Sequence, residues 1–169
     1  DDATLALVDL DHFAETNDAL GHQFGDTLLI AVAGRLQTQL GPQLTVARLG
    51  GDIFCVLGDS SQVNPAKILA LFQAPFCIDG QDVQLSATLG LVRLGEHAGT
   101  GADALKDADI ALKRAKSQQR AGHFYFSRSM GIEIRERVRM MHALRTACGQ
   151  GQLFVVYQPQ IDLTTRRPV

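Results

Sequence analysis

The sequence has no apolar run near the roughly eighteen residues that span a bilayer, and no stretch that resembles a signal peptide. It also lacks an excess of charge of one sign, because 16 Lys and Arg against 18 Asp and Glu give a formal net charge of −2. Such a balance offers no electrostatic basis for non-specific binding to nucleic acid. We therefore expect no membrane segment within this chain, no nucleic-acid partner and a cytoplasmic location, although a longer parent protein can carry membrane segments upstream.

The chain is also poor in cysteine. Cys55, Cys77 and Cys148 form an odd set without paired spacing, and each has apolar neighbours in the sequence. This pattern predicts reduced thiols in the core, which fits the cytoplasm. The sequence shows no internal repeat and no low-complexity tract, and 169 residues with 46% hydrophobic content can bury one substantial core.

A glycine pair followed by a carboxylate is the most informative local feature. Gly50, Gly51 and Asp52 separate two apolar runs, Val46–Leu49 and Ile53–Leu57. Because glycine alone takes positive φ without steric cost, a glycine pair between two strand-like runs predicts a tight hairpin. Asp52 would then stand at the hairpin tip, where a core residue has no reason to be acidic.

Hydrophobic periodicity predicts an alternation of strands and helices. The first strand, Thr4–Val8, should deliver Asp9 at its end, and Asp26 should lie in the first turn of the following helix, where a carboxylate suits the helix dipole. Strands and helices in mixed order favour an antiparallel sheet with helices packed on it, an α+β fold. Besides the first strand and the hairpin, the expected elements are helices over 25–40, 65–72, 102–118 and 130–148 and strands over 76–78, 83–92 and 123–126.

Four segments resemble, in order and spacing, the motifs of the GGDEF family, the bacterial domains that condense two GTP molecules into cyclic di-GMP. These segments are Asp9–Phe13, Asn17–Asp26, Arg48–Phe54 and Ala108–Lys116. The resemblance runs from about Asp2 to Ser127, and the helix that usually precedes the first strand of the family has no counterpart. It implies a ferredoxin-like, nucleotidyl-cyclase-type α+β domain over residues 1–127, with an antiparallel sheet flanked by helices.

A second resemblance concerns the end of the sequence. Leu153–Leu163 is similar to the opening strand of EAL domains, which hydrolyse cyclic di-GMP, and the sequence stops at Val169 before the EAL triplet is expected. We therefore expect a connector helix over 128–150 and the first strand of a truncated EAL domain over 151–169. The parent protein would pair the two domains.

Two acids are candidates for a metal site. Joining two nucleoside triphosphates requires charge neutralisation, usually by Mg²⁺ on carboxylates, and Asp9 and Asp52 can meet where strand and hairpin end. The family resemblance implies that Asp9, the backbone carbonyl of Leu10 and Asp52 bind Mg²⁺. It also implies that Asp52 is catalytic, by activating the attacking hydroxyl. The alternative is that both acids are solvated turn residues.

Four further residues are candidates for binding GTP. Asn17 and Asp26 resemble the family's guanine-binding pair, and an amide with a carboxylate suits the donors and acceptors of that base. The alternative is that Asn17 caps a turn and Asp26 a helix. Lys116 and Arg120 resemble the family's phosphate-contacting pair, although cations at the end of a helix also satisfy free carbonyl groups.

The sequence departs from the family pattern at positions that matter for turnover. Ile53 stands where the family has a second acid, and Ala14 replaces a lysine that lies near the transferring phosphates. The stretch Gly41–Leu44 has no charge where many members carry an Arg-x-x-Asp product-binding site. A branched hydrocarbon cannot coordinate Mg²⁺, so these losses predict that nucleotide recognition is better preserved than synthesis.

Three functions follow as hypotheses. The first is a degenerate GGDEF domain, with little or no enzyme activity of its own, that binds GTP and regulates an attached EAL phosphodiesterase through the connector helix. The second is an active diguanylate cyclase that uses Asp9 and Asp52 alone and forms a homodimer with facing GTP sites. The third is a structural or dimerisation module that binds no nucleotide.

Overall fold

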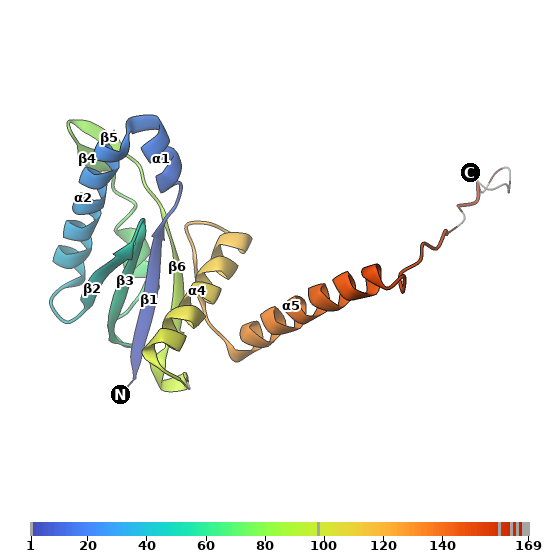
Figure 1. Cartoon of the computed structure of the whole chain (residues 1–169). Coiled ribbons are helices and arrows are strands. Elements are labelled where there is room, and N and C mark those ends of the chain that lie inside the picture. The colour runs from blue at the N-terminus through green and yellow to red at the C-terminus, as the bar shows by residue number, and fades with distance from the viewer. Residues whose placement is uncertain (1, 98, 159, 163, 165, 167–169) are drawn as a thin grey trace. The chain divides into compact units, whose positions relative to one another are not determined.

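The computed structural model describes residues 2–97, 99–158, 160–162, 164 and 166. The chain divides into two compact units, residues 1–131 and residues 132–169. The first unit holds the whole β-sheet of five strands and the helices that cover it (Figure 1). The second begins inside the long helix α5, Arg128–Gly149.

The five-stranded sheet has the order β2-β3-β1-β6-β7. Its central strand, β1, pairs antiparallel with β3 on one side and with β6 on the other. A separate two-stranded hairpin pairs β4 with β5. The strands are β1 (Ala3–Leu10), β2 (Thr45–Gly50), β3 (Ile53–Asp59), β4 (Phe76–Ile78), β5 (Gln81–Val83), β6 (Ala87–Arg93) and β7 (His123–Tyr125). The predicted α+β class with a sheet flanked by helices is confirmed.

One edge of the sheet is not antiparallel as the sequence predicted. β7 pairs with β6 in parallel, with Gly90 opposite Phe124. The chain reaches this edge through α4, Gly101–Gln118, which crosses over between the two strands. Parallel neighbours require such a crossover, and a hairpin turn cannot supply it.

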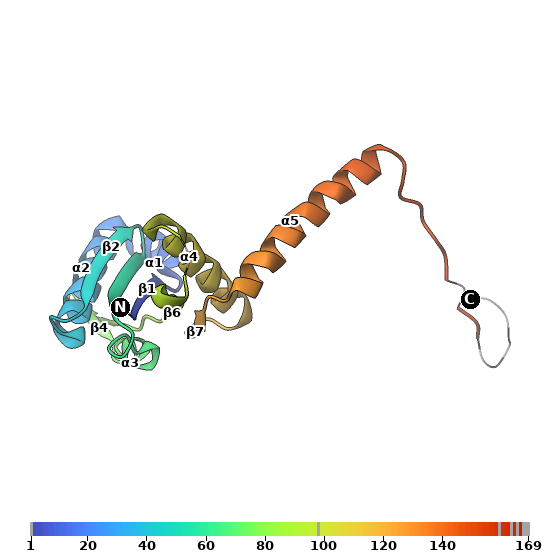
Figure 2. The ribbon, with the colours of Figure 1, turned by 90° about the horizontal axis from the view of Figure 1, so that it is seen from below.

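The two faces of the sheet bury two different sets of side chains. In β1, Leu5 and Leu7 belong to the cluster packed under α4, whereas Ala6, Val8 and Leu10 belong to the larger core under α2. This alternation is the period of two that a strand buried on both faces shows. The turned view in Figure 2 shows α2 and α4 on either side of the sheet. The carboxylate of Asp9 therefore faces the same side as α4.

The helices begin and end where capping chemistry allows. α4 starts at Thr100, whose hydroxyl accepts a hydrogen bond from the Asp103 N–H while the Asp103 carboxylate accepts one from the Thr100 N–H. This reciprocal pair is a capping box. α3, Pro65–Ala70, starts after Asn64, whose side chain accepts from the Lys67 N–H.

Several predicted boundaries were wrong. Helix α2 spans His22–Leu40 and follows α1, Phe13–Leu20, so Asp26 lies beyond the first turn of α2 and does not cap it. The predicted strand over 83–92 is two strands, β5 and β6, because residues 84–86 between them form no ladder. The predicted helix end at Gln118 is confirmed by α4, and Arg120, which the sequence placed at the end of a helix, lies in the turn after it. These errors concern where an element starts or breaks, and local pattern carries little information there.

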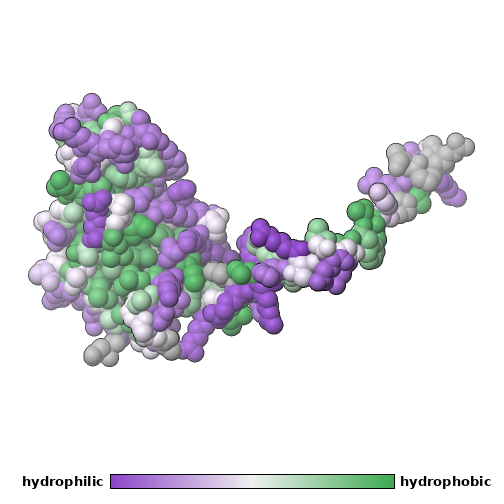
Figure 3. All heavy atoms as spheres, in the orientation of Figure 1, coloured by the Kyte–Doolittle hydropathy of each residue, from purple (hydrophilic) through white to green (hydrophobic). Residues whose placement is uncertain are grey.

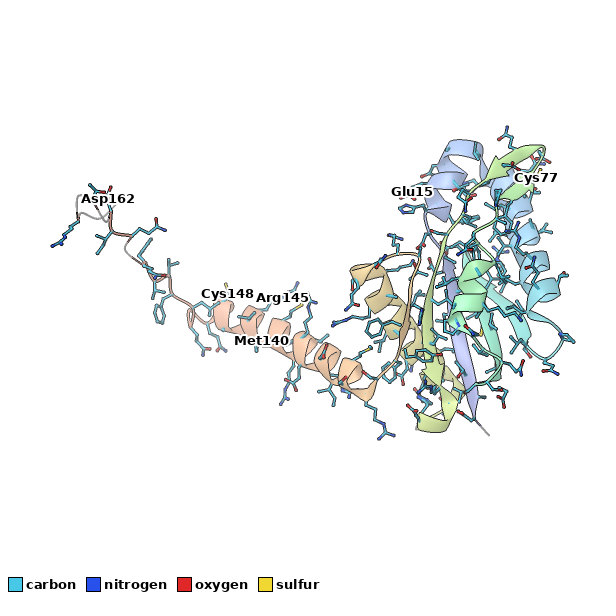
Figure 4. The ribbon with its side chains drawn as sticks, turned by 180° about the vertical axis from the view of Figure 1, so that it is seen from behind. Glu15, Cys77, Met140, Arg145, Cys148 and Asp162 are labelled. Atoms are coloured by element: carbon cyan, nitrogen blue, oxygen red, sulfur yellow. The ribbon has the colours of Figure 1, made fainter. Side chains whose placement is uncertain are left out.

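The cysteine prediction was also wrong for two of the three thiols. All three are free, but only Cys55 is buried, while Cys77 on β4 and Cys148 on α5 are exposed (Figure 4). Cys77 lies between buried Phe76 and Ile78 on a two-stranded hairpin. In such a hairpin alternate side chains point to opposite faces, so its apolar neighbours did not predict burial.

The second unit consists of the rest of α5 and the segment after it. Residues 153–158 form no strand in the structure, and Pro159 and Leu163 of the predicted strand lie outside the described residues. A strand requires a neighbour for its N–H and C=O groups, and none of the described residues pairs with 153–158. Within the part of the chain that the structure describes, no helix combines the length and the apolar character needed to cross a membrane.

Candidate nucleotide and metal site

The hairpin between β2 and β3 has the geometry that its glycines predict. Gly50 has φ +153° and Gly51 has φ +54°, and the ladder shifts register between Arg48 and Gly50. The Arg48 side chain closes the turn by donating from Nε to the Gly51 carbonyl at 2.9 Å. Asp52 follows at the tip and is half-buried. The hairpin reaches β1 directly, because the Leu10 N–H donates to the Asp52 carbonyl at 3.2 Å.

Asp9 is a buried carboxylate with one cationic neighbour. Its side chain is 7% exposed, and the Lys116 ammonium from the last turn of α4 lies 2.6 Å from Oδ1. Burial raises the pKa of Asp9, Lys116 counteracts the rise, and the nearby charges of Asp52 and Asp11 add to it. Asp9 is thus a buried carboxylate whose partner is the Lys116 ammonium.

Asp11 is a functional candidate that sequence reasoning missed. Its side chain is fully buried and accepts hydrogen bonds from Ser86 Oγ and Thr88 Oγ1, both at 2.8 Å, and from the Ala121 N–H at 3.2 Å. Arg120 Nη1 lies 3.4 Å from its Oδ1. Asp11 therefore holds the turn after α4 and the guanidinium on it. The sequence offered one indication of this role. Asp11 lies two residues after Asp9, and residues two apart point to the same face if the strand continues.

A separate pocket of about 270 Å³ lies beside α3 and the start of β6. Ser86 and Ala121 line it, together with apolar side chains such as Leu69 and Leu85. The acids Asp9 and Asp52 are not among its lining residues, so this pocket is distinct from the candidate metal site.

Asn17 stands at the contact between α1 and α2. Its Oδ1 is buried and has no hydrogen-bond partner among the described residues. A Cβ atom added at Gly25 would lie 1.8 Å from that oxygen and 3.1 Å from Phe13 Cζ. Only glycine at position 25 therefore leaves room for the Asn17 amide. Asp26 is the next residue along α2, and its side chain is exposed. The Asn17 oxygen therefore lacks a partner, and the Asp26 carboxylate is open to solvent.

The turn from β1 into α1 adds main-chain donors. His12 takes the left-handed conformation, with φ +60° and ψ +23°, and its ring is held by Glu15 at 2.5 Å. The first N–H groups of α1, at Phe13 and Ala14, have no acceptor within the helix. Such groups at a helix start favour an anion such as a phosphate. Ala14 is exposed and offers no side-chain charge.

Ile53 lies directly across from Asp9. The two residues are partners in the antiparallel ladder of β1 and β3, so their side chains project from the same face of the sheet. Ile53 is partly buried and packs against the cluster under α4, beside Leu57. Figure 3 shows apolar side chains gathered on the face of the first unit that is turned to the viewer. Because Ile53 is the ladder partner of Asp9, a hydrocarbon stands opposite this acid on β3.

The donors at this site fit a magnesium ion that keeps part of its water shell. Two carboxylates, Asp9 and Asp52, and the Leu10 carbonyl are hard oxygen ligands, and Mg²⁺ in nucleotide sites is commonly held by one or two carboxylates together with phosphates. The Asp9 carboxylate is buried, and its partner is the Lys116 ammonium. The described residues include no cluster of three or more His, Cys, Asp or Glu side chains able to hold a metal without help from a ligand.

The structure thus brings the predicted residues together in two groups. Asp9, Leu10, Asp52 and Lys116 meet at the end of β1, and Arg120 is joined to them through Asp11. Asn17 lies at the contact of α1 and α2, and Asp26 follows Gly25 of that contact along α2. The first group has acids and cations for metal and phosphate, and the second has donors and acceptors for a base.

A five-stranded α+β sandwich with acids where β1 meets the β2–β3 hairpin defines a domain of the nucleotidyl-cyclase type. The chain belongs to the GGDEF family, described as the diguanylate cyclase GGDEF domain, which matches residues 1–122. It is therefore a domain of cyclic di-GMP signalling.

Relatives at similar levels of identity include both synthetic and hydrolytic proteins. The chain is 36% identical to the bifunctional diguanylate cyclase/cyclic di-GMP phosphodiesterase MucR of Pseudomonas aeruginosa, over 95% of this chain and 24% of MucR. It is 35% identical to the cyclic di-GMP phosphodiesterase NbdA of the same organism, over 93% of this chain and 21% of NbdA. The solved GGDEF domain of P. aeruginosa TpbB superposes with a TM-score of 0.73 at 37% identity, covering 79% of this chain and 82% of that one. The chain spans less than a quarter of the length of MucR and NbdA.

Proposed function

We propose that this domain binds GTP as a regulatory ligand and has lost most of its capacity to condense two GTP molecules. The observation that carries the proposal is the pairing of Ile53 with Asp9 across β1 and β3. A second carboxylate at position 53 would stand beside Asp9 and share the charge of a metal ion. Isoleucine cannot coordinate Mg²⁺, and it adds apolar surface where charge must be stabilised.

Each retained residue has a role in this proposal. Asp9, the Leu10 carbonyl and Asp52 would hold Mg²⁺, which neutralises phosphate charge when bound. Lys116 and Arg120 would contact the phosphates, because cations on a rigid helix end and an anchored turn suit an anion. In an active enzyme, Asp52 would also activate the attacking hydroxyl.

Asn17 and Asp26 would recognise guanine. The unpartnered Asn17 oxygen supports this role, because an unsatisfied buried polar atom is costly unless a ligand or water pairs with it. Asp26 can accept from the ring N–H and the exocyclic amine of guanine at once. The structural alternative, that Asn17 serves as a turn cap, gains no support from a side-chain oxygen without a donor.

The proposed output is an EAL phosphodiesterase domain that follows in the parent protein. MucR and NbdA, both matched over more than nine-tenths of this chain, are described as phosphodiesterases in whole or in part. The exposed run Leu153–Tyr157 supports this proposal. Phe154 and Tyr157 are 84% and 91% exposed, and large apolar side chains of this kind are normally buried by other parts of a domain. Helix α5 would carry the signal. GTP can shift the phosphodiesterase only if it binds two domain arrangements unequally.

We predict that Gly25→Ala weakens guanine recognition while the domain stays folded. The new methyl group would occupy the place of Asn17 Oδ1, and the amide, as the end of a flexible side chain, would swing away. We expect GTP affinity to fall by about tenfold or more, since losing a hydrogen-bond pair costs about 1.5 kcal/mol. Calorimetry with GTP and Mg²⁺ on both proteins measures this loss.

Gly34→Ala is the matched control for that experiment. Gly34 lies on the same helix, is exposed, and has no atom within 4 Å of an added Cβ. The Gly34→Ala protein should bind GTP with the same affinity as the parent chain. An absence of GTP binding to the parent chain at millimolar nucleotide would refute the regulatory-ligand proposal and favour a nucleotide-free module. ATP should bind much more weakly than GTP if Asn17 and Asp26 read the base.

A further inference from the structure

We propose that Lys116 is a built-in cation that keeps divalent metal off Asp9 until a triphosphate draws the ammonium away. The proposal rests on the proposed nucleotide site and deepens it, because it assigns Lys116 two successive anionic partners. In the first state the partner is Asp9, and in the second it is the phosphate chain. Metal would then enter together with nucleotide and would bind poorly without it.

The geometry of the ion pair carries this inference. Lys116 Nζ lies 2.6 Å from Asp9 Oδ1, and the carboxylate is almost wholly buried. A Mg²⁺ ion would have to stand about 2.1 Å from the same oxygens. A divalent ion on the same oxygen would stand a few ångströms from the ammonium, and such like charges repel strongly in a partly buried site. Lys116 therefore weakens metal binding at Oδ1 for as long as it stays there.

The Lys116 side chain is free enough to move away from Asp9. Its side chain is 30% exposed, and its backbone is fixed by the buried residues Ala115 and Leu112 on the same helix. A lysine on a fixed helix can swing its flexible stem between neighbouring anions. Arg120 is paired less tightly, at 3.4 Å from Asp11 and 48% exposed, and would remain as the second phosphate contact.

The ion pair between Lys116 and Asp9 also explains how two neighbouring carboxylates are stabilised when no metal is bound. Asp9 and Asp52 are both acidic and come together where β1 reaches the β2–β3 hairpin, at the hydrogen bond from the Leu10 N–H to the Asp52 carbonyl, so their negative charges repel. A lysine that neutralises one of the two acids relieves this repulsion in the ligand-free domain. Removal of the Lys116 ammonium should leave the carboxylates of Asp9 and Asp52 without a cation, and such a pair attracts a divalent ion.

The decisive experiment titrates Mn²⁺, as a spectroscopically visible substitute for Mg²⁺, into the nucleotide-free chain at mildly alkaline pH. The variants are Lys116→Met, which removes the ammonium but keeps the stem, and Lys113→Met as its matched control. Lys113 lies one turn earlier on α4 and pairs with Asp109 at 2.6 Å, on the exposed side of the helix. Both variants lose one positive charge, so a non-specific effect would appear in both.

We expect Lys116→Met to bind Mn²⁺ at least about tenfold more tightly than the parent chain, while Lys113→Met binds it like the parent. Adding Asp9→Asn to Lys116→Met should remove the gain, which would locate the ion at Asp9. In the presence of Mg²⁺ the same Lys116→Met variant should bind GTP more weakly, because a phosphate contact is lost. The two ligands should thus respond in opposite directions to one substitution.

An unchanged or reduced Mn²⁺ affinity in Lys116→Met would overturn the inference, and so would an equal gain in Lys113→Met. These outcomes are independent of GTP binding. If the parent chain binds no GTP but the Mn²⁺ gain appears, the proposed function fails and the guarding of Asp9 by Lys116 stands. If GTP binds and no Mn²⁺ gain appears, the proposed function stands and the exchange of Lys116 is refuted.

Discussion

Restoring two charges, with Ile53→Glu and Ala14→Lys together, should raise cyclic di-GMP formation by about a thousandfold. A carboxylate at position 53 would stand across the ladder from Asp9 and complete a three-acid set with Asp52. A lysine at position 14 would project from the first turn of α1, beside the main-chain donors of the β1–α1 turn. A gain of about 4 kcal/mol in transition-state stabilisation corresponds to that factor in rate.

The measurement is cyclic di-GMP and pyrophosphate released from GTP and Mg²⁺, by chromatography, at equal protein concentration. Ile30→Glu with Ala19→Lys is the control pair, because it adds the same charges at exposed positions of α2 and α1. It should leave the rate at that of the parent chain. If the parent chain makes cyclic di-GMP as fast as the repaired variant, Ile53 and Ala14 are not what limits synthesis, and the chain is an active cyclase.

The same repair should lower the stability of the domain. Ile53 is partly buried against the cluster under α4, so a glutamate there loses some apolar contact. The repaired variant should therefore unfold at a lower temperature than the parent even while its activity rises. An activity gain together with a stability loss is what a trade between packing and function predicts.

Gly90→Ala should destabilise the first unit strongly, and more than the same change at Gly58 or Gly34. Gly90 lies in the middle of β6, where α4 packs on the sheet. A Cβ atom there would stand 2.2 Å from the Ala108 carbonyl oxygen and 2.3 Å from the Leu112 nitrogen. Both are backbone atoms of a helix, so the clash is relieved only if α4 moves. We expect a loss of about 3 kcal/mol or more, the upper range for overpacking a core.

Two other glycines calibrate this result. Gly58→Ala meets the Leu44 Cδ2 atom, the end of a side chain, and should cost clearly less, because a rotamer change relieves it. Gly34→Ala meets nothing within 4 Å in the middle of α2 and should stabilise the chain by about 0.5–1 kcal/mol. Urea unfolding followed by circular dichroism ranks the three. A Gly90→Ala protein as stable as the parent would contradict the close packing of α4 on β6.

A shift of α4 would also reach the candidate site. Lys116 and the turn that carries Arg120 are the C-terminal end of that helix and the residues that follow it. If Gly90→Ala still folds, its ion pair between Lys116 and Asp9 should lengthen. The Mn²⁺ titration would then report a tighter ion than in the parent chain, as it should for Lys116→Met.

Much of the architecture follows from local pattern. The apolar run Thr4–Val8 predicted a buried central strand, and the spacing of Leu29, Val32 and Leu36 predicted α2, since burial of one stripe requires a period near 3.6. The glycine pair predicted the β2–β3 hairpin, because its two positive φ angles exclude most other residues. The starts and breaks of elements were predicted less well, as at His22 and at residues 84–86.

The sequence by itself determined the family and the uncharged side chains at Ile53 and Ala14, because these are properties of residue type and spacing. Only the tertiary structure decided which charges meet. Lys116 neutralises Asp9, and Arg120 approaches Asp11 across 109 positions of sequence. Such pairs form because α4 packs on the sheet at Gly90, which brings the C-terminal end of α4 close to the C-terminal end of β1. No local pattern records which distant carboxylate a lysine will find, since that choice depends on long-range packing.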